Sequence, residues 1–480
     1  MTTSTPVFLR VLFLSCVAAL GGFLFGYDSG VINGTVTALS KAFDSSNLGS
    51  GLNVSSMLLG CAAGAFLAGR IADRFGRKAA LLTAAILFAI SSWGSGIAPG
   101  SMEFIFFRLL GGFAVGAASI ICPAYISEIA PPGLRGRLAT LQQMAIVLGL
   151  FSAFLVNYIL ANTAGGASEV LFFGFQTWQW MFWAELIPVS VFFTGLLFIP
   201  ESPRYLVASG KSKEAKHVLI SVSSPEEAEK ILKDIEASLE VGHRPRFADL
   251  VDKETKTVHP IVWVGIFIAA LQQLVGINVV FYYGEVLWSA AGFSVENALL
   301  INVIGGIINV SATVGAILLV DKWGRKPLLI LGGILMAFFL SVLAGVFASA
   351  DIGPGGDLQL GSTAGVVALI SANLYIVGFG LSWGPVMWVL LGEMFPNRLR
   401  GAALSLAGLT QWSANFLVTM TFPLLLAGIG LGGAYGIYAL FAAIATLYAW
   451  KIVPETKGRT LEQMSNSLAS PDDKDSSAKG

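Results

Sequence analysis

Two opposite charges stand alone inside long apolar stretches of this sequence. Asp28 lies in the run from residue 8 to 34, and Arg108 lies in the run from 103 to 127. A carboxylate at membrane depth costs at least about 2.5 kcal/mol on insertion scales, so it needs a partner or a task. The two groups can stabilise each other, and protonation of Asp28 would leave Arg108 unpaired. The pair favours a proton or ion site, and a structural, hydrogen-bonded aspartate is the alternative.

Amide side chains form a second set of polar residues within the apolar runs. Gln272, Gln273 and Asn278 share one run, in which Gly276 offers a break that would bring Asn278 toward the glutamines. Amides both donate and accept, and aromatic rings cover C–H faces, so the set suits a polyol such as a sugar. For any single amide the alternative is a bond between helices. Candidates in other runs are Gln142, Gln143, Asn309, Trp388, Gln411, Trp412 and Asn415.

Membrane helices are the elements that must position these residues. Of the 480 residues only 12% are charged and 55% are hydrophobic, whereas a soluble protein carries about 25% charged residues. No Ser/His/Asp or Cys/His constellation occurs within the apolar runs, so an enzyme is disfavoured, and no metal or cofactor site is expected. Runs of helix length predict an all-α protein with twelve membrane helices, at about 8–34, 52–70, 79–98, 103–127, 138–161, 180–199, 259–287, 297–320, 327–350, 364–392, 402–426 and 433–453.

Three charged motifs occur twice in the same order, which indicates a duplicated six-helix unit. Internal repeats of this kind are typical of secondary transporters that alternate access around a central site. We therefore predict an N-terminal bundle over 1–200, a cytoplasmic linker with short helices over 201–257, a C-terminal bundle over 258–464, and a disordered tail over 465–480. The matched motifs are Gly69–Lys78 with Val320–Lys326, Glu128–Gly136 with Glu393–Gly401, and Pro200–Arg204 with Pro454–Gly458.

The charged motifs also predict a gating network at one end of the helices. Bidentate pairs of arginine and carboxylate hold geometry well, and we expect Glu128 to pair with Arg135 and Glu393 with Arg400. The alternative to a gating network is that these charges only set the membrane topology and are otherwise ordinary solvated loop residues. The predicted members are Asp73, Arg77, Glu128, Arg135, Glu201, Arg204, Asp321, Arg325, Glu393, Arg400 and Glu455.

Lysine and arginine predict the orientation. The predicted helices are joined by loops that alternate between the two sides of the membrane. Of the 29 lysines and arginines, Arg108 is intramembrane and Lys41, between the first and second helices, is the only one in the loops of its side. The rest lie in the loops of the other side or at the termini. Positive charge concentrates on the cytoplasmic side. Both termini and the linker are therefore expected in the cytoplasm.

These motifs resemble the sugar porter family of the major facilitator superfamily, over nearly the whole chain. The sequence is most similar to cyanobacterial glucose transport proteins, and it also resembles the bacterial xylose:proton symporter and mammalian facilitative glucose transporters. The resemblance implies that proton-coupled members keep an aspartate at the position of Asp28, where facilitative members have asparagine. By motif match it implies sugar contacts or pocket lining at Phe25, Gln143, Gln272, Gln273, Asn278, Asn309, Trp388, Gln411, Trp412 and Asn415.

Two departures from glucose-selective mammalian members bear on substrate choice. This chain has Val275 after Gln273-Leu, where they have serine, so exclusion of fructose is not implied. It also has Gly380 where they carry a glutamate.

The sequence therefore predicts a hexose carrier, with D-glucose as the first substrate and fructose or other monosaccharides as further ones, that works by alternating access with proton symport. An uncoupled uniporter and a non-transporting sugar sensor are the alternatives. The expected partners are a monosaccharide, protons and the lipid bilayer, with no nucleic acid. We expect a monomer in a bacterial inner membrane.

Overall fold

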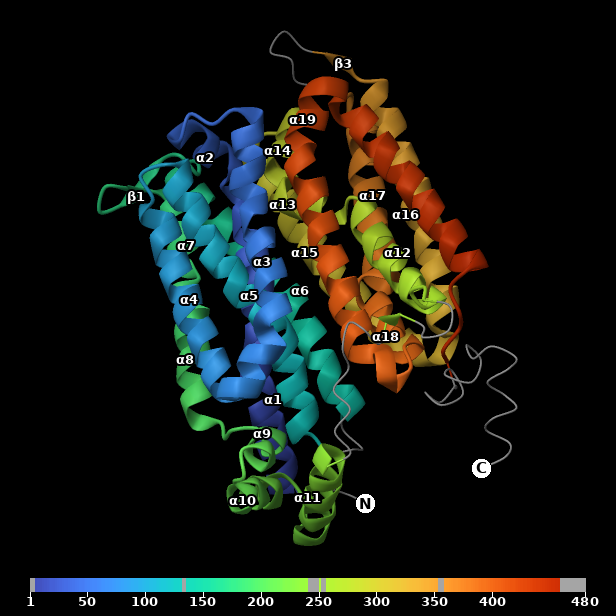
Figure 1. Cartoon of the computed structure of the whole chain (residues 1–480). Coiled ribbons are helices and arrows are strands. Elements are labelled where there is room, and N and C mark those ends of the chain that lie inside the picture. The colour runs from blue at the N-terminus through green and yellow to red at the C-terminus, as the bar shows by residue number, and fades with distance from the viewer. Residues whose placement is uncertain (1–4, 132–134, 241–249, 252–255, 353–357, 458–480) are drawn as a thin grey trace. The chain divides into compact units, whose positions relative to one another are not determined.

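The structure, a computed structural model, describes residues 5–131, 135–240, 250–251, 256–352 and 358–457. Apart from two short hairpins, its regular elements are helices (Figure 1). The chain forms two compact units, one of residues 1–242, 279–307 and 419–424, the other of 243–278, 308–418 and 425–480. The first unit thus includes short C-terminal segments as well as the N-terminal bundle.

The N-terminal part of the chain follows the predicted order of helices. The helix α1 is followed by the short helices η1 and α2, and the sixth predicted helix is divided into α7 and α8 at Glu185. The bounds are α1 Thr5–Val31, η1 Ile32–Gly34, α2 Val36–Ala42, α3 Asn47–Phe75, α4 Arg77–Ile97, α5 Ser101–Ile129, α6 Arg135–Ala164, α7 Thr177–Ala184 and α8 Leu186–Phe198.

The predicted linker contains three short helices, α9 (Pro203–Ala208), α10 (Ser212–Val222) and α11 (Pro225–Glu240). They lie together next to the start of α1 (Figure 1). An apolar core joins them, and it includes Leu206, Leu219 and Leu232.

The C-terminal part of the chain has more breaks in its helices than the sequence predicts. The seventh predicted helix is divided into three helices, and the tenth contains a π-helix, η3. The bounds are α12 Pro260–Leu274, α13 Ile277–Tyr282, α14 Gly284–Ala290, α15 Val295–Trp323, α16 Arg325–Ala348, α17 Ser362–Gly378, η3 Phe379–Trp383, α18 Pro385–Met394 and α19 Asn397–Lys451.

Within the described residues, eleven helices are long and apolar enough to cross a membrane. The last of them, over Leu399–Lys451, has 53 residues, which would extend about 80 Å as one helix, against a hydrocarbon core of about 30 Å. Gly430 interrupts it with a φ of 68°, so it makes two crossings. The prediction of twelve membrane helices is confirmed.

Two antiparallel hairpins, which the sequence analysis did not predict, join helices outside the spans. The first pairs β1 (Val170–Phe172) with β2 (Phe175–Gln176), and the second pairs β3 (Asp351–Ile352) with β4 (Leu358–Gln359). Strands of two or three residues lack a periodic pattern long enough to detect in a sequence.

Glycine allows α3 and α5 to pack at backbone distance. A Cβ atom at Gly60 or Gly64 of α3 would meet the carbonyl oxygens of Leu109 or Phe113 on α5. Conversely, Gly112 of α5 faces the backbone of α3. Small residues at four-residue spacing are how helices approach closely in lipid, where apolar burial drives association little. This contact holds the helix that carries Arg108.

Replacement of Gly64 by leucine tests the importance of this approach. The new side chain would meet the carbonyl oxygen of Phe113, so we expect a loss of about 1–3 kcal/mol and a lower thermal unfolding midpoint in detergent. Gly69→Leu on the same helix is the matched control, because no heavy atom lies within 4 Å of a Cβ atom there. Equal midpoints for the two variants would contradict the packing argument.

Candidate functional site

The sequence predicts a contact between Asp28 and Arg108, and the structure contains it. A terminal nitrogen of Arg108 on α5 pairs with Asp28 Oδ1 on α1, and the two residues are 1% and 2% exposed. The other terminal nitrogen donates to the Asp28 backbone oxygen at 3.2 Å and contacts Met57 Sδ at 3.0 Å. The guanidinium also lies over the Phe182 ring, 5.6 Å from its centroid. Arg108 therefore keeps neutral partners when the carboxylate is neutralised.

A second carboxyl group is buried in the same bundle. Glu185, between α7 and α8, is 1% exposed and accepts a hydrogen bond of 2.9 Å from Ser92 on α4. Glu185 stands at the break between α7 and α8, and its contact with Ser92 links this break to α4. The α-helical period of an unbroken segment could not indicate this.

Four amides form one hydrogen-bonded chain in the second unit. Gln272 accepts from Gln273 at 3.0 Å and from Gln411 at 3.0 Å, and Asn278 donates to Gln273. Gln272 itself donates to the Trp383 carbonyl at 2.8 Å. Gly276, with a φ of 81°, separates α12 from α13, so the predicted helix break is present. It is this break that lets Asn278 reach Gln273.

The remaining sugar candidates lie on separate helices of the two units. Asn309 on α15, Trp412 and Asn415 on α19 are buried, and Trp388 on α18 is 36% exposed. Phe25 on α1 and Gln143 on α6 belong to the first unit and are partly buried. The neighbouring Gln142 is buried, and neither polar atom of its side chain has a hydrogen-bond partner among the residues that the structure describes. The roles of all these residues in sugar binding stay predictions.

Gly380 lies in the π-helix η3 and faces Asn309. A Cβ atom there would come 3.0 Å from Asn309 Oδ1 and 2.8 Å from the methyl group of Ala312. A larger side chain would therefore have to displace these groups. The close packing of Asn309 and Ala312 against Gly380 thus leaves little room for the glutamate that glucose-selective mammalian members carry here.

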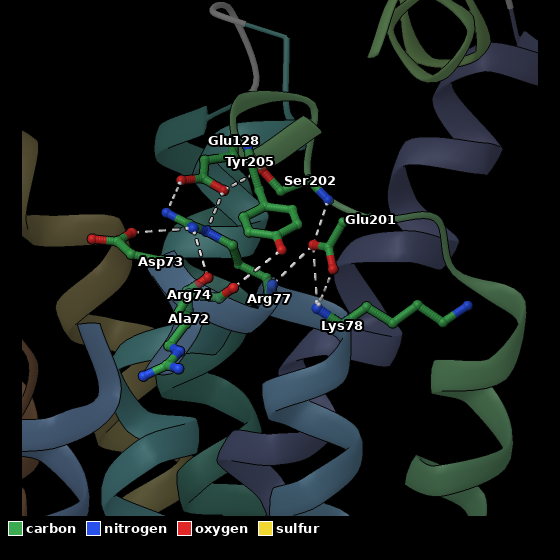
Figure 2. A network of polar contacts seen from close by, with 9 residues as sticks. All are labelled: Ala72, Asp73, Arg74, Arg77, Lys78, Glu128, Glu201, Ser202 and Tyr205. Atoms are coloured by element: carbon green, nitrogen blue, oxygen red, sulfur yellow. Dashed lines mark hydrogen bonds and ion pairs between the residues drawn. The ribbon is translucent and has the colours of Figure 1, made fainter. Parts of the chain in front are cut away.

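The charged motifs of the N-terminal half form one network (Figure 2). Arg77 makes two hydrogen bonds of 3.1 Å to Glu128 and an ion pair of 3.2 Å with Asp73. Glu128 also accepts from Ser202. Glu201 accepts from the backbone N–H groups of Arg77 and Lys78, at the first turn of α4. Carboxylates at helix N-termini are favoured by the helix dipole.

The C-terminal half repeats this network residue for residue. Arg325 pairs with Glu393 at 2.7 Å and with Asp321 at 3.0 Å. Thr456 donates to Glu393 at 2.6 Å, in the place of Ser202. Glu455 accepts from the backbone N–H groups of Arg325 and Lys326, at 3.1 and 2.9 Å. The matched motifs of the sequence are thus matched in their contacts.

Glu128 and Glu393 pair with Arg77 and Arg325, which come from the preceding motif rather than their own. Their expected pairing with Arg135 and Arg400 stays a prediction. Arg400 donates to the Phe395 carbonyl at 3.4 Å. Arg204 is exposed on α9, and the side chain of Arg135 lies outside the described part of the chain. A role in gating stays a prediction for all eleven residues.

Comparison with known proteins agrees with this architecture. Residues 14–468 match the family model described as "Sugar (and other) transporter". The chain belongs to this family. Its predicted identity as a transporter rather than an enzyme is thereby confirmed.

Two relatives and one solved structure cover almost the whole chain. A glucose transport protein of Synechocystis is 52% identical over 95% of this chain and 97% of its own length. The D-xylose-proton symporter of Escherichia coli is 38% identical over 94% of both chains. The inward-open structure of the xylose transporter XylE from Escherichia coli matches with a TM-score of 0.80 at 37% identity, over 95% of this chain and 99% of that one. The predicted major facilitator fold is confirmed.

Glu455 predicts a pH dependence of stability. Burial raises the pKa of this carboxyl, but hydrogen bonds from the backbone N–H groups of Lys457, Arg325 and Lys326 outweigh it, so the folded-state pKa lies below the usual range. A lowered folded-state pKa stabilises the protein above the unfolded pKa, about 4.3, and this stabilisation is lost as the pH falls through the folded pKa. We expect Glu455→Gln to lose at most about 1 kcal/mol at neutral pH, because solvent screens the site, and nothing at strongly acid pH.

Unfolding of the detergent-solubilised protein at several pH values measures this difference. Glu296→Gln, at an exposed carboxyl group, is the control and is expected to match the wild type throughout. A Glu455→Gln defect of the same size at all pH values would contradict the assignment.

Proposed function

We propose that this chain carries a hexose, with D-glucose as its main substrate, together with a proton into the cell. The observation that carries the proposal is the buried pair of Asp28 and Arg108. Asp28 is titratable and has no access to water in this structure. Such a group suits a carrier in which a proton binds in one conformation and leaves in another. The relatives named as a glucose transport protein and a D-xylose-proton symporter support the substrate class and the coupling.

In this mechanism Asp28 holds the proton and Arg108 responds to its charge. While Asp28 is ionised, its pairing with Arg108 joins α1 to α5. Protonation removes the Coulomb attraction between the two side chains, and of its contacts with described residues Arg108 then keeps those to the Asp28 carbonyl, the Met57 sulfur and the Phe182 ring. A buried cation with neutral partners alone favours a different packing of these helices. Movement of α1 against α5 would thus follow the proton.

The sugar would bind at the amide chain of the second unit. The side chains of Gln272, Gln273, Asn278 and Gln411 already donate and accept among themselves. A sugar hydroxyl can replace either partner in such a bond, because it also donates and accepts. We propose that Asn309, Trp388, Trp412 and Asn415, with Phe25 and Gln143 from the first unit, complete the set of sugar contacts.

We further propose that the protein acts as a monomer in a bacterial plasma membrane, with both termini in the cytoplasm. The lysine and arginine distribution supports this orientation. Two six-helix bundles over 1–200 and 258–464 are the proposed moving parts, with the helices over 201–257 between them. The two equivalent networks around Arg77 and Arg325 each tie helix ends together within one bundle. Each bundle would then move as a body.

Labelled-glucose uptake into proteoliposomes with an imposed pH gradient tests the coupling. We expect the wild type to accumulate glucose above equilibrium, and Asp28→Asn to equilibrate it and keep exchange, because asparagine cannot exchange the proton. Asp44→Asn is the matched control, since Asp44 is exposed. A wild type that only equilibrates glucose would be a uniporter. If neither protein moves any monosaccharide, while the wild type binds glucose, the chain is a sugar sensor.

A second prediction concerns Gln272. This side chain accepts two hydrogen bonds in the amide chain, so alanine removes the partner of both Gln273 and Gln411. In the proposed site Gln272 would bind sugar hydroxyls in place of these two bonds, so at about 1 kcal/mol for each lost sugar contact we expect glucose affinity to fall at least about tenfold. Isothermal titration in detergent measures the dissociation constant, and Gln359→Ala on β4, at an exposed position, is the control. Unchanged affinity in Gln272→Ala would remove the amide chain from the sugar site.

A further inference from the structure

A cluster of polar side chains joins four helices of the first unit at the end far from the charged network. We name Asn33, Thr37, Glu285, Ser289 and Asn302 the outer latch. Its elements lie beside α2, which precedes the start of α3, whereas Asp73 and Arg77 lie at the end of that 29-residue helix. The latch is therefore on the outer side in the proposed orientation.

The contacts of the outer latch connect N-terminal helices to segments that come late in the chain. Asn33 of η1 donates to the Phe281 carbonyl at 2.9 Å, and accepts from Asn302 of α15 at 2.8 Å and from the Glu285 N–H at 3.3 Å. Gly284 allows this approach, because a Cβ atom there would meet both asparagines. The latch holds α14 and α15 against the end of α1.

At the centre of the latch lies a carboxyl group. Glu285 is 3% exposed, and Thr37 of α2 lies 2.7 Å from its Oε2 atom. Ser289, one turn later on α14, lies 3.4 Å from its Oε1 atom. Both neighbours are hydroxyls, which can donate to a carboxylate or accept from a carboxylic acid. The hydrogen bonds of Glu285 therefore persist when it takes up a proton.

No described lysine, arginine or histidine forms an ion pair with Glu285. On α2 the charged residue is Lys41, one turn beyond Thr37 and exposed. η1 has no titratable side chain, α14 has none besides Glu285, and on α15 the first turn carries the exposed Glu296. A buried carboxylate without a counter-charge is strongly disfavoured, while the neutral acid costs far less. Closure of the latch around the neutral form is accordingly the more stable arrangement.

We propose that Glu285 is a proton-sensing residue of the outer latch, which closes with this carboxyl neutral and opens as the carboxyl becomes exposed to water and ionises. The proposal rests on the proposed transport function. Because the latch lies at the outer end, the proton on Glu285 enters and leaves on the outer side. It therefore changes how readily the latch closes at a given outside pH, without adding to the protons carried with the sugar.

Hydrogen–deuterium exchange of the peptides that cover 281–302 tests the proposal on the purified full chain. Rates are measured from about pH 5 to about pH 8 and corrected for the intrinsic pH dependence of exchange. Above the pKa that Glu285 has in the open, water-exposed form, the ratio of ionised to neutral carboxyl in that form grows tenfold per pH unit, so protection in the wild type is expected to fall by up to about tenfold per unit. In Glu285→Gln it is expected to stay constant with pH, because glutamine cannot ionise.

Two further variants separate the titration from a loss of structure. Glu296→Gln neutralises an exposed carboxyl on the neighbouring helix and should keep the wild-type profile. Thr37→Val removes the hydroxyl but leaves Glu285 ionisable, so protection should drop at every pH and keep its pH dependence. A pH profile in Glu285→Gln equal to that of the wild type would overturn the proposal. So would a flat profile in Thr37→Val.

The readout is independent of Asp28, so the two assignments can fail separately. Asp28→Asn is expected to keep the pH-dependent protection of 281–302 even though it loses accumulation. Glu285→Gln is expected to keep accumulation of glucose under a pH gradient. Loss of accumulation in Glu285→Gln, with accumulation intact in Asp28→Asn, would overturn the latch assignment and make Glu285 the coupling group.

Discussion

The pairing of one buried carboxylate with one buried guanidinium is the interaction on which the proposed mechanism depends. Within a bundle of apolar helices neither Asp28 nor Arg108 is tolerable alone, so α1 and α5 must meet where the two side chains meet. The glycine contact between α3 and α5 places Arg108 at that depth. A proton on Asp28 then acts on helix packing directly, because the pair itself is part of the packing.

The duplicated charged network shows a different use of charge. Around Arg77 and Arg325 the carboxylates lie at helix ends near water, where burial is partial and salt bridges contribute geometry more than stability. Bidentate contacts and helix N-termini fix the angles at which helices leave the membrane. Both halves keep the same partners, including a hydroxyl from Ser202 or Thr456. The two halves share partners rather than an identical geometry, since Arg77 binds Glu128 through two nitrogens and Arg325 binds Glu393 through one.

Much of this could be read from the sequence, because hydropathy and charge act over whole helices. Twelve crossings, the repeat, and the contact between Asp28 and Arg108 follow from the scarcity of charge in apolar runs. The breaks at Glu185 and in the π-helix η3 could not be predicted, since they depend on neighbouring helices. The same holds for the partners of Glu128 and Glu393: a carboxylate at a helix end has several arginines within reach, and only packing selects one. Glu285 lies near the end of the predicted helix 259–287, but its partners could not be predicted, because Thr37 is more than two hundred positions away in the sequence.

The amide chain suggests why a carrier can bind sugar specifically without holding it tightly. In the structure Gln272, Gln273, Asn278 and Gln411 satisfy one another, so the empty site leaves few polar atoms without partners. In the proposed site a sugar exchanges these bonds for its own, and the net gain per bond is small. A ligand that breaks the chain without replacing its bonds is disfavoured, because each lost bond costs free energy. Gly276 contributes to this arrangement, because the helix break at this residue lets Asn278 reach Gln273.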